Sequence, residues 1–274
     1  MFHRPTLRFA LVATLWIGPT VPARPAEEPV DDKARAAEAR SLAREAAQMY
    51  SFSRGDGRER PDLHPEPVLR WTNPILGAVH GDIYLWTSRG RPEVVASFVT
   101  WYHPFKHRTH EFHSLSPGPI VGERSGTPVW TSPRPGVELI PIPGAPEPAA
   151  TPASRLRQMR DLARLFTGRQ TDRTGVDRDM RLLSQPLYRY ERTEGDLHDG
   201  ALFAFALGTD PDAFLLIEDR TVDGETRWLY GLTRMTALAM QIRHRDHEVW
   251  NAPLLGNGSI YGHREPYTCF WNGE

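Results

Sequence analysis

The chain of 274 residues has 39% hydrophobic and 24% charged residues, which is typical of a folded protein with one large hydrophobic core or two smaller ones. Its formal net charge of -1 argues against a general nucleic-acid or membrane-surface binder, because such proteins carry a surplus of basic residues. The single cysteine, Cys269, leaves no internal disulfide, so packing must stabilise the fold, and Cys269 itself is expected to be a small buried apolar residue.

The N-terminal residues have the pattern of an export signal. Two arginines precede the apolar stretch 9–17, and the small residues Val21 and Ala23 lie at the positions that a cut after Ala23 requires. The apolar stretch is shorter than the roughly 20 residues that a membrane anchor needs. Residues 1–23 are therefore predicted to be a signal peptide, and the mature protein to be exported to the periplasm or the extracellular space without membrane insertion.

The first predicted helix follows a spacer at residues 24–30. Asp31 and Asp32 supply an N-cap and favourable charge at its start, and apolar residues recur at helical spacing up to about Phe52. Gly55 lies just beyond and is a C-terminal stop signal.

The second predicted helix follows a proline-rich linker at residues 133–150. Thr151 can cap this helix, Pro152 fits its first turn, and Gly168 ends it. Each helix is followed by short apolar runs that turns with glycine or proline separate, which indicates antiparallel strands. The predicted strands span residues 68–71, 82–87, 93–102 and 109–115 after the first helix, and 181–190, 201–207, 213–218, 227–232, 237–243 and 247–250 after the second.

A repeated spacing relates the two halves of the chain. The separation of Gly81 and Pro92 equals that of Gly200 and Pro211, and an apolar run follows each proline. Such self-similarity predicts a duplicated supersecondary unit. Several strands are apolar on both faces, so each sheet needs two covers. We therefore predict an α+β fold of two tandem helix-then-antiparallel-sheet units, four strands to a unit, whose sheets pack together with pseudo-twofold symmetry.

These elements define the predicted domain boundaries. The first helix-plus-sheet unit spans residues 24–132 and the second spans residues 151–255, with the linker between them. Residues 256–274 form a C-terminal tail. Its aromatic residues predict that the tail docks onto the core: Tyr261, Tyr267, Phe270 and Trp271.

Four short strings carry a resemblance to a known family: residues 84–87 (YLWT), 110–112 (HEF), 114–119 (SLSPGP) and 208–211 (GTDP). With them the chain resembles a family of exported hypothetical proteins of planctomycete-type bacteria, over most of the mature chain. The resemblance implies export and implies no catalytic residue. The order of one helix and a four-stranded meander is also similar to the cystatin-like and nuclear-transport-factor-like folds, and this similarity does not carry function.

One group of residues has the composition of a metal site. His107, His110, Glu111 and His113 lie close together in the sequence, and Glu111 and His113 are expected on one face of a strand. Such a group can provide ligands to zinc or another transition metal. The alternative is a polar hairpin whose histidines are solvated or hydrogen-bonded to the backbone, because metal sites usually need ligands from more than one loop.

A second group consists of aromatic residues in the first unit. Tyr84, Trp86, Trp101 and Tyr102 are candidates for a concave sheet face that stacks against a sugar or another flat ligand. The alternative is ordinary core packing, because half-buried strands use the same residue types.

These features favour an exported soluble binding or envelope-associated module without catalytic activity and without a cofactor, whose partner is a protein or a glycan. No complete catalytic motif supports an enzyme. The alternative function is a cavity-type enzyme or a metal-binding protein that uses His110 and Glu111 as an acid/base pair or as metal ligands.

Overall fold

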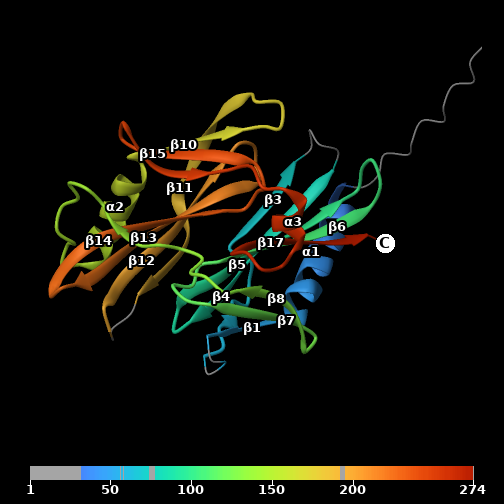
Figure 1. Cartoon of the computed structure of the whole chain (residues 1–274), viewed down its shortest axis with the longest axis horizontal. Coiled ribbons are helices and arrows are strands. Elements are labelled where there is room, and N and C mark those ends of the chain that lie inside the picture. Colours follow the sequence, from blue (N-terminus) through green and yellow to red (C-terminus); the bar gives the residue numbers. More distant parts are fainter. Residues whose placement is uncertain (1–31, 56, 58, 74–77, 192–194, 274) are drawn as a thin grey trace, which may run out of the picture. The chain divides into compact units, whose positions relative to one another are not determined.

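The structure, a computed structural model, describes residues 32–55, 57, 59–73, 78–191 and 195–273 (Figure 1). Strands hold 54% of these described residues and helices 15%. The predicted signal peptide and spacer lie outside the described residues. Within the described part of the chain, neither long helix is apolar enough over a sufficient length to cross a bilayer.

The N-terminal elements are one helix and eight strands. They are α1 (Asp32–Met49), β1 (Tyr50–Arg54), β2 (Asp62–Leu63), β3 (Leu69–Asn73), β4 (Val79–Ser88), β5 (Arg91–Trp101), β6 (His107–Ser114), β7 (Ile120–Arg124) and β8 (Thr127–Ser132). The remaining elements are β9 (Ile140–Pro141), α2 (Pro152–Ala163), β10 (Phe166–Thr171), β11 (Asp177–Glu191), β12 (Leu197–Ala206), β13 (Pro211–Val222), β14 (Glu225–Arg234), β15 (Ala239–His244), β16 (His247–Ala252), α3 (Asn257–Tyr261) and β17 (Tyr267–Gly273).

These strands form three antiparallel sheets among the described residues. The first large sheet has the order β17-β6-β5-β4-β2, with β3 also paired to β4. The second has the order β16-β15-β10-β11-β12-β13-β14-β9, and β1, β7 and β8 form a small sheet. Strand β17 belongs to the C-terminal tail and pairs with β6, while α1 at the other end of the described chain packs on β4 and β5. Both ends therefore belong to the first sheet and its cover (Figure 1).

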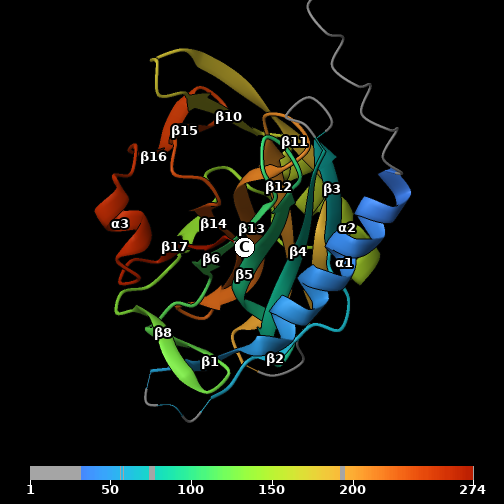
Figure 2. The ribbon, with the colours of Figure 1, turned by 90° about the vertical axis from the view of Figure 1, so that its right-hand side faces the viewer.

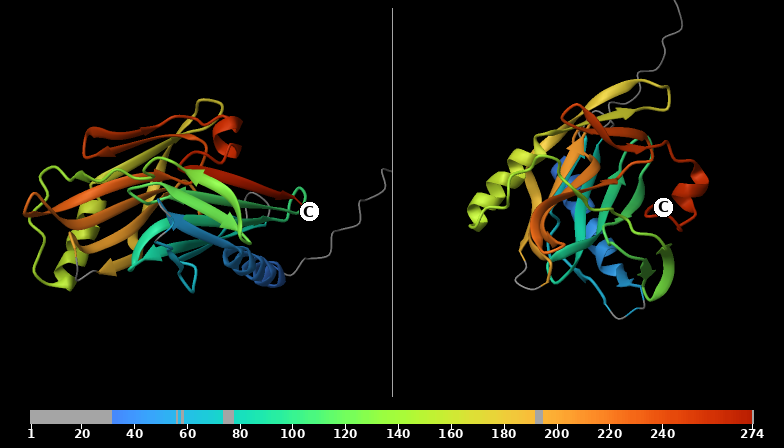
Figure 3. Two further views of the ribbon diagram at one scale, coloured as in Figure 1. Left: turned by 60° about the horizontal axis from the view of Figure 1, so that its bottom comes forward. Right: turned by 60° about the vertical axis from the view of Figure 1, so that its left-hand side comes forward.

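The two large sheets pack face to face, and a helix covers the other face of each. Ile83 and Leu85 of β4 share one buried cluster with Leu202 of β12 and Leu216 of β13. Helix α1 lies along β4 and β5 and buries its alanines against the first sheet (Figure 2). Helix α2 lies against β11, β12 and β13 of the second sheet (Figure 3). Strands that are apolar on both faces therefore have a cover on each side, as the sequence predicted.

The hairpins β4–β5 and β12–β13 contain the same irregularity. In each hairpin the register shifts beside the repeat proline, which leaves Glu93 and Asp212 as the extra residues of two β-bulges. The Glu93 carbonyl accepts a hydrogen bond from the Leu115 amide at 2.8 Å, and the Asp212 carbonyl accepts one from the Met235 amide at 2.7 Å. Each bulge thus lies near the start of the second strand of its hairpin, and its carbonyl accepts a hydrogen bond from the residue that directly follows the next strand, β6 or β14.

Both repeat glycines lie opposite an aromatic residue. Gly81 pairs with Trp71 across β3 and β4, and Gly200 pairs with Tyr190 across β11 and β12. A Cβ atom on Gly81 would lie 2.2 Å from the Trp71 ring, and one on Gly200 would lie 2.4 Å from the Tyr190 ring. In both places only glycine leaves room for the ring that crosses the strand.

The predicted helices are present, but the predicted positions of their C-terminal ends were wrong. Thr151 caps α2, since its hydroxyl accepts a hydrogen bond from the Ser154 amide at 3.2 Å, as predicted. Helix α1 ends at Met49, and Phe52 lies in β1 instead, where alternate residues are buried and pair with β7. Likewise Gly168 lies in β10, not at the end of a helix. Cross-strand pairing, which is not local, decided both boundaries.

The strand count and the tail also differ from the prediction. Neither large sheet has four strands, because β2 and β17 extend the first and β9, β10, β15 and β16 extend the second; of these, only β15 and β16 lie where strands were predicted, at residues 237–243 and 247–250. The tail is therefore an edge strand of the first sheet and not a separate segment. The tail docks onto the core, as predicted: Tyr267 and Cys269 are buried, whereas Tyr261 and Trp271 are 45% and 53% exposed.

Candidate functional site

Strand β6 places the predicted histidines on its two opposite faces. His110 points toward α1, where its Nδ1 lies 3.0 Å from the Tyr50 hydroxyl oxygen and its ring contacts Phe98. Glu111, the next residue, points toward the second sheet and accepts a hydrogen bond from the Tyr267 hydroxyl at 3.1 Å. His110 and Glu111 therefore cannot act together as an acid/base pair, because successive strand residues face opposite sides of the sheet.

His107 and His113 lie on the same face as Glu111, yet each is engaged by its own neighbours. The His107 ring is stacked between Trp101 and Trp271, with ring centroids 5.4 Å and 4.4 Å away. Nδ1 of His113 lies 2.8 Å from the Ser114 carbonyl oxygen, and burial lowers the pKa of His113 to about 4.

The predicted metal ligands do not converge on one point. His110 is separated from the other three by the sheet itself. Among the described residues, no group of three or more His, Cys, Asp or Glu side chains has the arrangement to hold a metal ion.

The four predicted aromatic residues do not form one ligand-binding surface. Tyr84 and Trp86 are only 2% and 1% exposed and belong to the core beneath α1, so the core-packing alternative holds for them. Tyr102 is tied to α1, since its hydroxyl donates to the Glu38 carboxylate at 2.8 Å. Trp101 faces the opposite side of the sheet and lines a cavity.

This inter-sheet cavity has a volume of about 100 Å³ and lies between the first sheet and the β12–β13 hairpin. Strands β3 to β6 and the hairpin both contribute to its wall. The lining residues are Trp71, Asn73, Val79, Ser97, Val99, Trp101, Thr109, Glu111, Asp210, Pro211, Asp212, Met235 and Thr236. The cavity therefore unites two residues that the sequence singled out, Trp101 and Glu111, with several that it did not.

Three residues of the cavity wall carry carboxyl groups: Glu111, Asp210 and Asp212. Burial raises the pKa of Glu111 to about 7, and the charges of Asp210 and Asp212 raise it further against the hydrogen bond from Tyr267. Burial likewise raises the pKa of Asp212 to about 6, although the Leu207 amide and the Gln170 side chain each donate to it at 2.7 Å. The charges of Asp210 and Asp212 thus oppose the ionisation of Glu111.

Two indole rings complete the wall. The Nε1 atoms of Trp71 and Trp101 are buried and have no hydrogen-bond partner among the described residues. The residues that line the cavity include no lysine, arginine or histidine. The site therefore combines negative charge and aromatic surface with two unused hydrogen-bond donors.

The equivalent place in the other hairpin is filled by a cation of the protein itself. Arg91 directly precedes Pro92, as Asp210 directly precedes Pro211. The Arg91 guanidinium donates to Glu218 at 2.9 Å and to Glu93 at 3.1 Å, and all three side chains are at most 3% exposed. One bulge thus has its carboxylates neutralised by arginine, whereas the other does not.

Sequence reasoning missed Trp71, Asp210 and Asp212. A signal for Asp210 was present, because aspartate precedes Pro211 whereas arginine precedes Pro92. The scan against family models and the searches of curated proteins and of solved structures found no match to this chain.

Proposed function

We propose that this protein is an exported binding module without catalytic activity, and that its inter-sheet cavity binds a small organic amine that also carries an oxygen acceptor. The observation that carries the proposal is the charge difference between the two bulges. Where Arg91 neutralises Glu93 and Glu218, the other copy has Asp210 and Asp212 beside Glu111 in the wall of a cavity of about 100 Å³.

We also propose that the two halves arose by duplication and are related by a pseudo-twofold axis. The shared bulges at Glu93 and Asp212 support this relation, as do the pairs of Gly81 with Trp71 and Gly200 with Tyr190. Under this relation the amine takes the place that a guanidinium occupies in the other copy.

The chemistry of the cavity restricts the ligand. An ammonium group donates hydrogen bonds to the carboxylates of Glu111, Asp210 and Asp212, and it is attracted to the faces of indole rings. An oxygen on the same ligand accepts from Nε1 of Trp71 or Trp101, which otherwise stay unpaired. One water molecule needs about 10–15 Å³ of cavity volume, so a cavity of about 100 Å³ has room for several non-hydrogen atoms. A ligand of the size of ethanolamine fits this volume.

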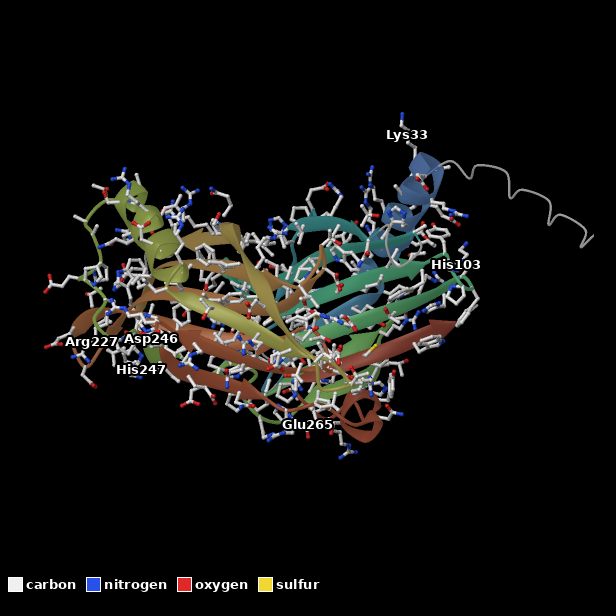
Figure 4. All side chains as sticks on the ribbon, turned by 90° about the horizontal axis from the view of Figure 1, so that it is seen from above. Lys33, His103, Arg227, Asp246, His247 and Glu265 are labelled. Carbon is white, nitrogen blue, oxygen red and sulfur yellow. The ribbon has the colours of Figure 1, made fainter. Side chains whose placement is uncertain are left out.

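Titration calorimetry with ethanolamine tests this proposal. Asp210→Asn and Glu111→Gln are each expected to weaken binding about tenfold, because each removes a charged hydrogen-bond partner. Asp246→Asn is the matched control and should bind as the wild type does. Asp246 lies in an exposed turn, at the opposite end of the view from His103, which follows β5 (Figure 4). Binding of Zn²⁺ in place of the amine, or equal binding by all variants, would contradict the proposal.

The affinity for the amine should rise with pH. Glu111 and Asp212 have pKa values of about 7 and about 6, so both carboxyl groups are protonated at acidic pH and lose their protons as the pH rises through these values. Because the ammonium group binds the charged carboxylates, affinity increases between about pH 5 and pH 8 and binding releases protons. Calorimetry in buffers of different ionisation enthalpy measures this release.

Export is a separate part of the proposal, supported by the arginines, the apolar stretch 9–17 and the small residues before residue 24. Protein recovered from the periplasm or the medium is expected to begin at Arg24, which N-terminal sequencing determines. A product that retains Met1 would count against a cleaved signal peptide. A protein or glycan partner stays a prediction.

A further inference from the structure

A second and larger cavity lies between α1 and strands β3 and β4. It has a volume of about 760 Å³. We call it the helix cavity; the residues that matter here are Arg40 of α1, Arg70 of β3, His80 and Asp82 of β4, and Phe98 of β5. Lys33, at the exposed start of α1, also lines it (Figure 4).

Asp82 is a buried carboxylate that accepts no hydrogen bond from the described residues. Its side chain is 8% exposed, and the nearest cationic atom, Nε of Arg70, lies 3.8 Å away. That distance is too long for a hydrogen bond. No described residue donates a hydrogen bond to this carboxylate, although leaving such a group unpaired costs free energy. The helix cavity therefore presents a strong acceptor that the described part of the chain does not use.

His80 lies on the same face of β4, two residues before Asp82. Its Nε2 atom is buried and has no partner among the described residues. Its ring packs edge-on against Tyr102, with the centroids 5.9 Å apart. Burial lowers the pKa of His80, so the ring is neutral and can exchange a hydrogen bond with a ligand hydroxyl.

The rim of the helix cavity is positively charged. Arg40 is exposed, and no described residue forms an ion pair with it. Arg70 is exposed as well, and its guanidinium forms an ion pair with the Glu66 carboxylate at 3.0 Å. Cationic side chains around a concave site attract anions and raise their local concentration. The floor below this rim is apolar, because Phe98 and the alanines of α1 form it.

We propose that the helix cavity is a second ligand site, which binds a small organic anion that carries hydroxyl groups, such as a sugar acid. The ligand carboxylate binds Arg40 and Arg70, and a ligand hydroxyl donates to Asp82 and contacts Nε2 of His80. This inference rests on residues other than those of the inter-sheet cavity, so either site can exist without the other.

The test compares gluconate with hexanoate, which has the same charge and chain length but no hydroxyl group. Titration calorimetry should show that the wild type binds gluconate about tenfold more tightly than hexanoate. Asp82→Ala should remove this preference, and Arg40→Ala should weaken both anions about tenfold. Arg157→Ala, which changes an exposed arginine on α2, is the matched control and should change neither.

A loss of folding would not explain these results. The residue at the position of Asp82 in the second repeat is Ala201, so Asp82→Ala introduces a side chain that the fold already accepts there. Its melting temperature should not fall, because an unpaired buried carboxylate is removed. Equal affinity of the wild type for gluconate and hexanoate, or unchanged binding by Arg40→Ala, would overturn the proposal.

The pH dependence separates this site from the inter-sheet cavity. Burial raises the pKa of Asp82 to about 6 against the charges of Arg70, Arg40 and Arg44, with Glu66 raising it. Hexanoate affinity should therefore fall between about pH 5 and pH 7, because Asp82 becomes negative and repels an anion that offers it no hydroxyl group, whereas gluconate, which donates to the charged carboxylate, should lose less. The decline should disappear in Asp82→Ala; a decline that persisted there would contradict the role of Asp82.

Discussion

Replacing Arg91 by methionine is expected to lower the free energy of unfolding by about 3–5 kcal/mol. Arg91 starts β5 in the first sheet, and its partner Glu218 lies in β13 of the second. Arg91→Met keeps much of the volume of the side chain but removes the cation from a buried network. Glu218, which is fully buried, would lose its 2.9 Å hydrogen bond from Nε of Arg91. The cost is that of an incompletely compensated buried charge.

The surroundings of Glu218 show why the loss is large. Its carboxylate also accepts hydrogen bonds from the Tyr190 hydroxyl at 2.7 Å and from Arg220 at 2.5 Å. Burial raises the pKa of Glu218, but the charges of Arg91 and Arg220 outweigh this effect and hold the pKa below 4.5. In the unfolded chain the carboxyl binds protons more readily, so its contribution to stability is present above about pH 4.5 and is lost as the pH falls.

Urea denaturation of Arg91→Met and the wild type measures the effect. Arg227→Met is the control, because Arg227 forms an exposed ion pair with Glu225 at the end of the molecule farthest from α1 (Figure 4), and its midpoint should not change. Glu218→Gln combined with Arg91→Met should cost less than the sum of the two single changes, since the residues contact each other. An Arg91→Met protein as stable as the wild type would show that the network contributes nothing.

Replacing either repeat glycine by alanine is expected to lower the free energy of unfolding by about 1–3 kcal/mol. The new Cβ would lie 2.2 Å from the Trp71 ring in Gly81→Ala and 2.4 Å from the Tyr190 ring in Gly200→Ala. Carbon atoms cannot approach so closely, so the aromatic ring must leave its place in the packed interior. Similar losses at both positions would support the relation between the two halves.

A double-mutant cycle tests the physical cause. In a Trp71→Leu background the ring that obstructs residue 81 is absent, so Gly81→Ala should cost much less there than in the wild type. Gly258→Ala is the control, because a Cβ on Gly258 meets nothing within 4 Å and its backbone suits any residue. An equal cost of Gly81→Ala in both backgrounds would show that backbone strain, and not the Trp71 ring, is responsible.

The elements that sequence reasoning located have strong local signals. Thr151 and Pro152 mark the start of α2, and the repeat prolines mark the starts of two hairpin strands that are buried on both faces. The apolar character of both faces also implied that each sheet is covered on two sides. These properties depend on the hydrogen-bonding needs of the backbone and on periodicity, which neighbouring residues specify.

The tertiary structure decided the features that depend on distant pairing. Tyr50 and Phe52 suit the end of a helix as well as a strand, and only pairing of β1 with β7 places them in the small sheet. Tyr267 and its neighbours read as a tail until β6 is available as their partner. In both cases the competing local conformations differ little in energy, so burial against a remote segment selects one.

The candidate sites follow the same division. The sequence determined that the residues before the two repeat prolines, Arg91 and Asp210, have opposite charges, and it predicted that Glu111 lies in a strand. Only the fold brings Asp210 and Asp212 to the cavity of Glu111, while it directs His110 to the far side of the sheet. The burial and the charge of a site depend on residues that are far apart in the chain, so they are determined only when the two sheets pack together.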